Sequence, residues 1–206
     1  MLLKIISGAQ TGVDRAALDA AMALGVPCGG WVPAGRLDED GVIPAHYPVK
    51  ELEKGSFKQR TIQNLMDADG TLIIYHHAVE GGTEETLFRC IKLHRPYHLI
   101  NAAEISPERA SERAVGFVRE RQITSLNVAG PRASKWPEGY HFAFEVVAGL
   151  IEALSESRRE ASSEFPVKQA NPPTNIGERP LFWKYIVFPK AQASEEAVRR
   201  ANLGIK

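Results

Sequence analysis

Apolar residues along the chain follow two patterns. Continuous apolar runs rich in β-branched side chains, clearest over residues 70–75, are typical of strands buried on both faces of a sheet. Segments with an apolar side chain every three or four positions predict helices that bury one face. The predicted strands are residues 2–7, 28–32, 70–75, 97–101 and 125–129, and the predicted helices are residues 14–24, 57–68, 81–94, 106–121 and a last one that follows Gly139 and ends near Leu154.

Strands and helices alternate through residues 1–154, and this order predicts both the fold class and the domain boundary. It predicts an α/β domain with a three-layer, Rossmann-like architecture, in which helices cover both faces of a parallel sheet. Residues 155–206 are predicted to form a linker and a C-terminal extension, because they begin as a polar stretch with prolines. Within the extension, the apolar segment 181–189 predicts burial on this domain, on a sheet edge or on a second subunit.

Composition narrows the range of partners and compartments. Among the 206 residues, 25 Lys and Arg balance 25 Asp and Glu, and a neutral chain has no overall field to attract nucleic acid or an anionic membrane. The N-terminal apolar run is broken by Lys4 and is too short for a signal peptide, and no window approaches the roughly 20 apolar residues that cross a bilayer. The two cysteines, Cys28 and Cys90, cannot form a disulfide framework, so we expect a cytoplasmic protein.

Three glycine-containing loops follow predicted strands, at residues 8–14, 80–83 and 130–135. In a parallel sheet the carboxyl ends of the strands meet at one edge, where helix N-termini turn free N–H groups outward and ligands bind. Neither the dinucleotide fingerprint nor the P-loop Gly-Lys-Ser/Thr is present, which argues against an NAD site or an ATPase. Any one loop is more often just a tight turn, but the three together predict a phosphate-binding site.

Charged and hydroxyl side chains near these loops supply candidate ligand contacts. Arg132 is the strongest, because a guanidinium directly after Gly130-Pro131 can hold two phosphate oxygens. Thr11 and Thr83 either bind an anion or cap helices. Acids close to two of the loops suit ribose hydroxyls, a bridging cation such as Mg²⁺, or helix capping. The acids are Asp14, Glu84 and Glu85, and the further cations are Arg15, Arg36, Arg60 and Lys135.

A longer series of motifs runs through most of the chain in a fixed order. It comprises Gly8–Asp19, Gly29–Trp31, Gly35-Arg36, Glu39–Gly41, Arg60-Thr61, Asp69–Leu72, Gly81–Thr83 and Val128–Arg132. In these motifs the chain resembles the circularly permuted YpsA-like family of molybdenum carrier-like proteins, part of the SLOG superfamily of Rossmann-like nucleotide-ligand proteins. The resemblance covers about residues 3–154, and the strand before Gly130 corresponds to the first strand of unpermuted relatives.

The resemblance implies a cavity for a phosphorylated molecule of nucleotide or pterin type, with the molybdenum cofactor as one candidate. We also expect a homo-oligomer. The family pattern has a lysine where this chain has Ala34, which removes one expected anion contact. Taken with the loops, the resemblance gives these expected ligand-binding residues: Gly8, Gln10, Thr11, Gly12, Asp14, Arg36, Arg60, Gly81, Gly82, Thr83, Gly130, Arg132 and Ser134.

Two other functions remain open from the sequence. Related phosphoribohydrolases carry Gly-Gly-x-Gly-Thr-x-x-Glu, whereas this chain lacks the third glycine and has Thr86 near the expected glutamate. An enzyme cleaving the N-glycosidic bond of a nucleoside monophosphate would then use Glu84 or Glu85 as its carboxylate. The third hypothesis is an interaction protein acting through residues 181–189.

Histidine and tryptophan offer weaker signals. His76 and His77 follow each other at the end of a predicted strand, where adjacent side chains point to opposite faces, so we expect no metal site even with His46 or His141 nearby. Trp31 either stacks on a ligand ring or packs beside a buried strand. The three glycine-containing loops and the family resemblance thus remain the basis for the expected partner, a phosphorylated small molecule.

Overall fold

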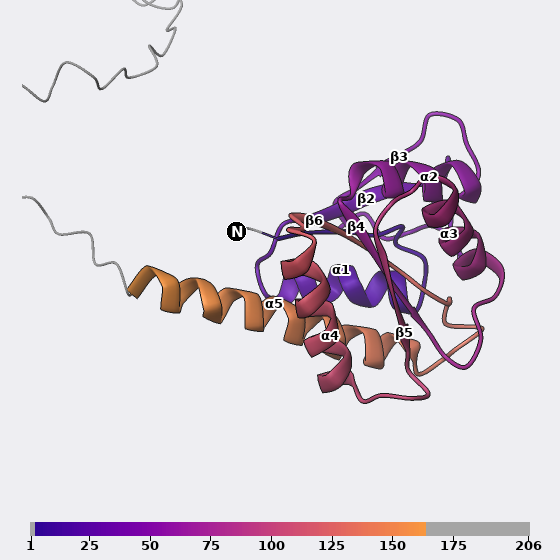
Figure 1. The fold of residues 1–206 in the computed structure, drawn as a ribbon. Coiled ribbons are helices and arrows are strands. Elements are labelled where there is room, and N and C mark those ends of the chain that lie inside the picture. Colours follow the sequence, from indigo (N-terminus) through magenta and orange to yellow (C-terminus); the bar gives the residue numbers. More distant parts are fainter. Residues whose placement is uncertain (1–2, 164–206) are drawn as a thin grey trace, which may run out of the picture. The chain divides into compact units, whose positions relative to one another are not determined.

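The structure is a computed structural model of the chain, and it describes residues 3–163. In this range one six-stranded sheet has the order β3-β2-β1-β6-β4-β5, and every neighbouring pair is parallel (Figure 1). This confirms the predicted α/β, Rossmann-like class. The strands are β1 (Lys4–Ile6), β2 (Cys28–Val32), β3 (Val49–Glu51), β4 (Gly70–Tyr75), β5 (Tyr97–Asn101) and β6 (Ser125–Ala129), and the helices are α1 (Val13–Ala23), α2 (Phe57–Asp67), α3 (Gly81–Lys92), α4 (Pro107–Glu120) and α5 (Gly139–Ser163).

Helices cover both faces of the sheet, as the continuous apolar runs predict. Leu72 and Ile74 of β4 join the large core beneath α1, α4 and α5, whereas Ile73 between them packs with Leu65 of α2 and Cys90 of α3. All three β4 side chains are fully buried, because successive strand residues point to opposite faces and helices cover both. The continuous apolar pattern of β4 is therefore explained by helices on either side.

Strand β6 comes last in the chain but lies between β1 and β4. Asp69, just before β4, helps to fix this placement: its Oδ2 accepts hydrogen bonds from the Thr124 amide at 2.9 Å, the Thr124 hydroxyl at 2.7 Å and the Ser125 amide at 2.8 Å. These bonds, led by the Thr124 hydroxyl, lower the pKa of Asp69 to about 2. The three glycine-containing loops follow β1, β6 and β4, so the inserted strand makes them neighbours.

The structure differs from the predicted elements in one missing strand and one helix end. Strand β3 was not predicted, because it has three residues of which only Val49 is buried, too short and too polar for a periodic signal. The last helix continues past Leu154 to Ser163. Residues 155–160 are mostly exposed, and they include Glu and Arg, which extend a helix without any apolar stripe. The apolar segment 181–189 and the rest of residues 164–206 lie outside the described residues.

The long loop between β2 and β3 is held firmly to the domain. Ile43 and Tyr47 are buried in a cluster with Leu18 of α1. The Arg36 guanidinium donates to three carbonyl oxygens, those of Val49, Pro44 and Tyr47, at 3.1, 3.2 and 3.4 Å. A second tie is the ion pair between Arg15 of α1 and Asp38. Residues 38–41, between these anchors, are therefore held against the loop that follows β1.

Candidate functional site

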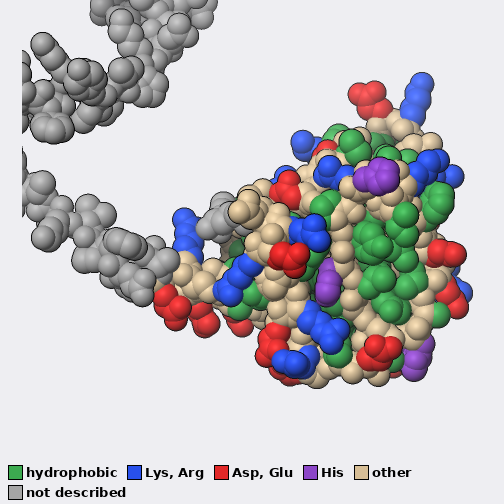
Figure 2. All heavy atoms as spheres, viewed as in Figure 1, with side chains coloured by type: hydrophobic (Ala, Val, Ile, Leu, Met, Phe, Trp, Pro, Cys, Tyr) green, Lys and Arg blue, Asp and Glu red, His purple; other side chains and the backbone are tan. Residues whose placement is uncertain are grey.

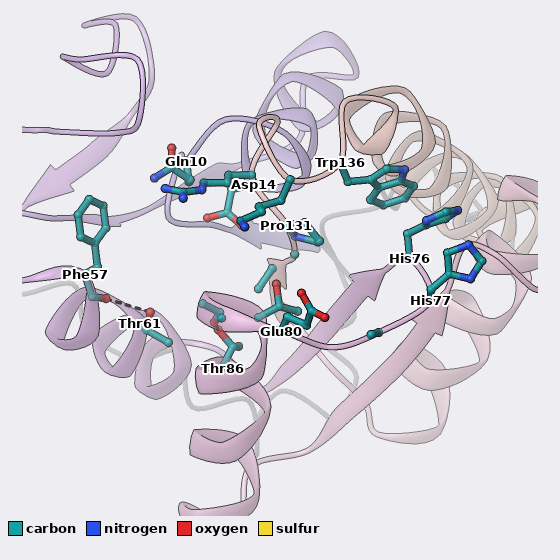
Figure 3. A pocket seen from close by; sticks show the side chains of 18 of the residues that line it. Gln10, Asp14, Phe57, Thr61, His76, His77, Glu80, Thr86, Pro131 and Trp136 are labelled. Atoms are coloured by element: carbon teal, nitrogen blue, oxygen red, sulfur yellow. Dashed lines mark hydrogen bonds between the residues drawn. The ribbon is translucent and has the colours of Figure 1, made fainter.

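A cavity of about 580 Å³ opens at the carboxyl ends of the central strands (Figure 3). Its volume lies within the usual range for small-molecule sites, roughly 300–1,000 Å³. The walls come from the loops after β1, β4 and β6 and from the first turns of α2 and α3. They comprise Gln10, Asp14, Phe57, Arg60, Thr61, His76, His77, Ala78, Glu80, Gly81, Gly82, Thr83, Thr86, Ala129, Gly130, Pro131, Arg132, Lys135 and Trp136.

Eight of the thirteen expected ligand-binding residues line this cavity, which brings together parts of all three loops. These eight are Gln10, Asp14, Arg60, Gly81, Gly82, Thr83, Gly130 and Arg132, whereas Gly8, Thr11, Gly12, Arg36 and Ser134 are not in the lining. Thr11 lies next to it, because its hydroxyl accepts a hydrogen bond from the Ala133 amide at 3.1 Å. Thr11, Thr83 and Arg132 are therefore grouped at the same edge of the sheet.

The first turn of α3, at Gly81 and Gly82, is bare in the sense that no other protein atoms cover it. Gly81 has a left-handed backbone (φ 56°) that favours glycine, but Gly82 does not, and a Cβ added at either position would meet nothing within 4 Å. Glu80 at the N-cap makes no side-chain capping bond. Within the described chain, the amides of Gly81 and Gly82 also have no hydrogen-bond acceptor. Two N–H groups at the positive end of a helix dipole thus lie beside open space in the cavity.

The other loop glycines make room for protein atoms. A Cβ on Gly8 would collide with the Arg60 guanidinium. A Cβ on Gly12 would lie 2.6 Å from the Pro131 carbonyl oxygen, and one on Gly130 would lie 2.5 Å from the carbonyl oxygen of Ile74. The N-terminus of α1 is likewise occupied by protein atoms, because the Val13 amide donates to the Pro131 carbonyl oxygen at 3.3 Å. These three glycines serve close packing between the loops.

A buried ion pair forms one wall of the cavity. Nη1 of Arg60, from α2, donates to Oδ2 of Asp14, from α1, at 3.1 Å, and the two side chains are only 13% and 4% exposed. Burial raises the pKa of Asp14, while the Arg60 charge and the amides of Gln10 and Gly130 act to lower it. The Arg60 Nε is buried and has no hydrogen-bond partner in the described chain. This nitrogen is enclosed by protein atoms, so Arg60 acts on the cavity through its charge and its pairing with Asp14.

The carboxylate in the cavity wall beside α3 is that of Glu80, at the N-cap, and not that of Glu84 or Glu85. Glu85 pairs with Arg89 at 2.7 Å on the same helix and with Lys58 at 3.9 Å, and Glu84 is exposed. Neither glutamate lines the cavity, whereas Thr86 does, with its hydroxyl donating to the Gly82 carbonyl at 2.9 Å. The two glutamates that the sequence offers for hydrolysis thus lie outside the cavity.

Aromatic and histidine side chains in the lining are the part that sequence reasoning missed. Phe57, the first residue of α2, is 48% exposed at the cavity, and His76 stacks on Trp136 with ring centroids 5.3 Å apart. The expectation that His76 and His77 point apart was wrong, since their rings lie 4.1 Å apart (Figure 3). Strand β4 ends at Tyr75, and His77 has a left-handed backbone (φ 62°), so strand alternation no longer applies. Among the described residues, no group of three or more His, Cys, Asp or Glu is placed to hold a metal ion.

Comparison with known proteins agrees with the fold. Residues 5–151 match the circularly permutated YpsA SLOG family. The chain belongs to this family. This circularly permuted YpsA SLOG protein is also similar to a solved structure from Syntrophus aciditrophicus SB, named "putative molybdenum carrier protein": the two are 41% identical with a TM-score of 0.71, over 73% of this chain and 95% of the other. No curated protein matches it. None of the helices within residues 3–163 is long and apolar enough to span a membrane.

Proposed function

We propose that this protein binds a phosphorylated small molecule, of nucleotide or pterin type, in the cavity at the carboxyl ends of its strands and acts as a carrier. The observation that carries the proposal is the bare N-terminus of α3, where Gly82 has neither a packing neighbour nor a backbone angle that requires glycine. Glycine within a helix costs about 0.5–1 kcal/mol relative to alanine. Space for a bound group is the remaining physical reason for it.

The charges around this opening suit an oxyanion. Three cations line the cavity: Arg60, Arg132 and Lys135. Two carboxylates line it as well: Asp14 pairs with Arg60, and Glu80 lies at the α3 N-cap, so the excess positive charge comes from Arg132 and Lys135 in the loop after β6. Backbone amides at a helix N-terminus together with guanidinium groups are typical ligands of phosphate.

The apolar lining favours a ligand that also carries a planar ring. Phe57 lines the cavity and is 48% exposed overall, and a phenyl ring there can stack on a base or a pterin. At another part of the lining, the stacked pair of His76 and Trp136 offers a second aromatic surface. A ligand with its phosphate at the N-terminus of α3 and its ring against one of these aromatic surfaces would contact both the polar and the apolar parts of the lining.

The carrier role rests on the name of the protein from Syntrophus aciditrophicus SB. If molybdenum is the cargo, the amide and guanidinium donors of the cavity suit molybdate itself or the phosphate of a molybdenum-bearing pterin. No cysteine is part of the lining within the described chain. Hydrolysis of a nucleoside monophosphate gains no support, because Glu84 and Glu85 are outside the cavity.

Thermal unfolding in the presence of candidate ligands tests the proposal. The panel comprises AMP, GMP, a pterin monophosphate, molybdate and inorganic phosphate, with adenosine as the control that lacks a phosphate. A ligand at a hundred times its Kd stabilises by about 2.7 kcal/mol, which raises Tm by roughly 5–10 °C for a domain of this size. No stabilisation by any of the five compounds would rule the proposal out. Release of free adenine from AMP would favour the hydrolase instead.

We further propose that the protein is a homo-oligomer, with α3 and β5 in the interface. Figure 2 shows hydrophobic side chains gathered over α3 and the β5 edge of the sheet. Phe88, Ile91 and Tyr97 are exposed there, by 52%, 53% and 38%. Contiguous exposed apolar surface of this kind marks association sites in soluble proteins. A second copy approaching by a two-fold axis would cover the same residues on both chains.

Changing Phe88 to lysine is expected to convert the oligomer to a monomer, because it places a charge in the centre of this apolar surface. Light scattering of the full chain measures the mass. Val42→Lys is the matched control, since Val42 is 69% exposed in the loop between β2 and β3. A wild-type protein that is already monomeric, or an oligomer unaffected by Phe88→Lys, contradicts this interface.

A further inference from the structure

Glu39, in the anchored loop between β2 and β3, gathers the polar groups that the sequence offers for a phosphate. Its carboxylate accepts hydrogen bonds from the hydroxyls of Thr11 and Ser134 and, at 3.1 Å, from the Ser134 amide. Its Oε2 lies 3.2 Å from Nε of Arg132. The Glu39 amide in turn donates to Oε1 of Gln10 at 3.0 Å. One side chain therefore connects the loops after β1 and β6 from outside the cavity.

The contact of Glu39 with Arg132 uses only one nitrogen of the guanidinium. Glu39 takes Nε, and within the described chain Nη1 and Nη2 of Arg132 have no partner. Arg132 lines the cavity and its side chain is 48% exposed. A guanidinium can bind a carboxylate along one edge and hold an oxyanion with its other nitrogens, which a lysine cannot do. The pair thus leaves the two terminal nitrogens free beside the cavity.

We infer that Glu39 is a positioning residue for ligand binding, and that it holds Arg132 so that Nη1 and Nη2 face the phosphate of a bound molecule. The inference rests on the proposed phosphate site and adds a residue outside the cavity to it. Glu39 does not touch the ligand and acts through Arg132.

Two features show why Glu39 is fixed enough to do this. The loop around it is tied down by buried Ile43 and Tyr47 and by the ion pair of Arg15 with Asp38. Burial acts to raise the pKa of Glu39, but the hydrogen bonds from Ser134 and Thr11 and the charge of Arg132 outweigh it and lower the pKa. The carboxylate is therefore already supplied with donors before a ligand arrives, and its lowered pKa favours the charged form.

Isothermal titration of the full chain with AMP, across a double-mutant cycle, tests this role. We expect Arg132→Gln to weaken AMP binding about tenfold and Glu39→Gln about fivefold, in line with loss of one charged hydrogen bond at a half-exposed site. In the double variant the affinity should equal that of Arg132→Gln alone, because Glu39 then has nothing to position. Adenosine, which lacks the phosphate, should bind wild type and Glu39→Gln equally.

Asp40→Asn is the matched control, because Asp40 is exposed, follows Glu39 directly and carries the same charge. It should leave AMP affinity within about twofold of wild type. Tighter AMP binding by Glu39→Gln would show that Glu39 competes with the ligand for Arg132. If Glu39→Gln lowers AMP affinity equally in the wild type and in Arg132→Gln, its role is general and structural. Either result overturns the inference while the phosphate site stands. Absence of binding of both AMP and inorganic phosphate to the wild type overturns the inference together with the phosphate site.

Discussion

Replacing Arg60 with methionine is expected to destabilise the folded domain by about 3–5 kcal/mol at pH 7, the usual cost of leaving one member of a buried ion pair alone. The Asp14 carboxylate is 4% exposed, and Arg60 is its ion-pair partner. Methionine keeps much of the length and apolar stem of arginine, so the loss comes mainly from the uncompensated charge. Urea denaturation of wild type and variant measures it.

The dependence of this loss on pH identifies Asp14 as its source. Burial already raises the pKa of Asp14 in the folded protein, and without Arg60 it rises further. A carboxyl group whose pKa is higher in the folded than in the unfolded chain favours the folded state as pH falls towards the unfolded value of about 4. The variant should therefore lose less stability at pH 5 than at pH 7. An equal loss at both values contradicts this account.

The double variant Asp14→Asn with Arg60→Met controls for packing. It removes both charges and keeps an amide that can still accept from the backbone near Gln10 and Gly130. It should recover most of the stability lost in Arg60→Met, because replacing both partners of a buried pair is far less costly than removing one. If the double variant is as unstable as the single one, the lost contacts of the arginine stem matter more than the charge.

Changing Gly82 to alanine is expected to weaken binding of AMP about a hundredfold while leaving the fold as stable as before or slightly more stable. The added methyl group meets no protein atom, so it causes no strain in the empty protein. It occupies the space above the first turn of α3, where a phosphate would accept from the Gly81 and Gly82 amides. Loss of two hydrogen bonds to a charged group, at about 1.5–3 kcal/mol each, accounts for an effect of this size.

Gly116→Ala is the matched control for this variant. Gly116 is exposed in the middle of α4, and a Cβ there also meets nothing within 4 Å. It should raise stability by about 0.5–1 kcal/mol without changing AMP affinity. Thermal unfolding and titration calorimetry of both variants separate the two effects. Unchanged AMP binding by Gly82→Ala would remove the bare α3 terminus from the proposed site.

The local pattern of the sequence was enough to predict most elements and the edge of the sheet where the cavity lies. β4, with Leu72, Ile73 and Ile74, is a continuous apolar run because helices cover both of its faces. β3 gave no such signal, since two of its three residues are exposed on an edge strand. The predicted final helix ended too early for a similar reason, because the polar second half of α5 buries no apolar stripe.

Within the candidate site, the sequence located the loops but did not distinguish between their glycines. Gly12 and Gly82 look alike in the sequence, yet one lies against a backbone oxygen and the other faces open space. The difference depends on which strand the neighbouring loop follows. Phe57 and the pair of His76 and Trp136 were missed for a related reason, because an aromatic residue carries no sequence signal for whether it faces a core or a cavity.

The sequence by itself determined that this chain forms a parallel α/β domain with glycine-containing loops at the ends of its strands, because turn residues and apolar periodicity act over a few neighbouring positions. Only the tertiary structure decided that β6 lies between β1 and β4, that Arg60 pairs with Asp14, and that Glu39 pairs with Arg132. Each of these depends on residues 46 or more positions apart in the chain. These arrangements follow from the order of the strands and from the cost of burying an unpaired charge. Neither can be predicted from a local sequence pattern.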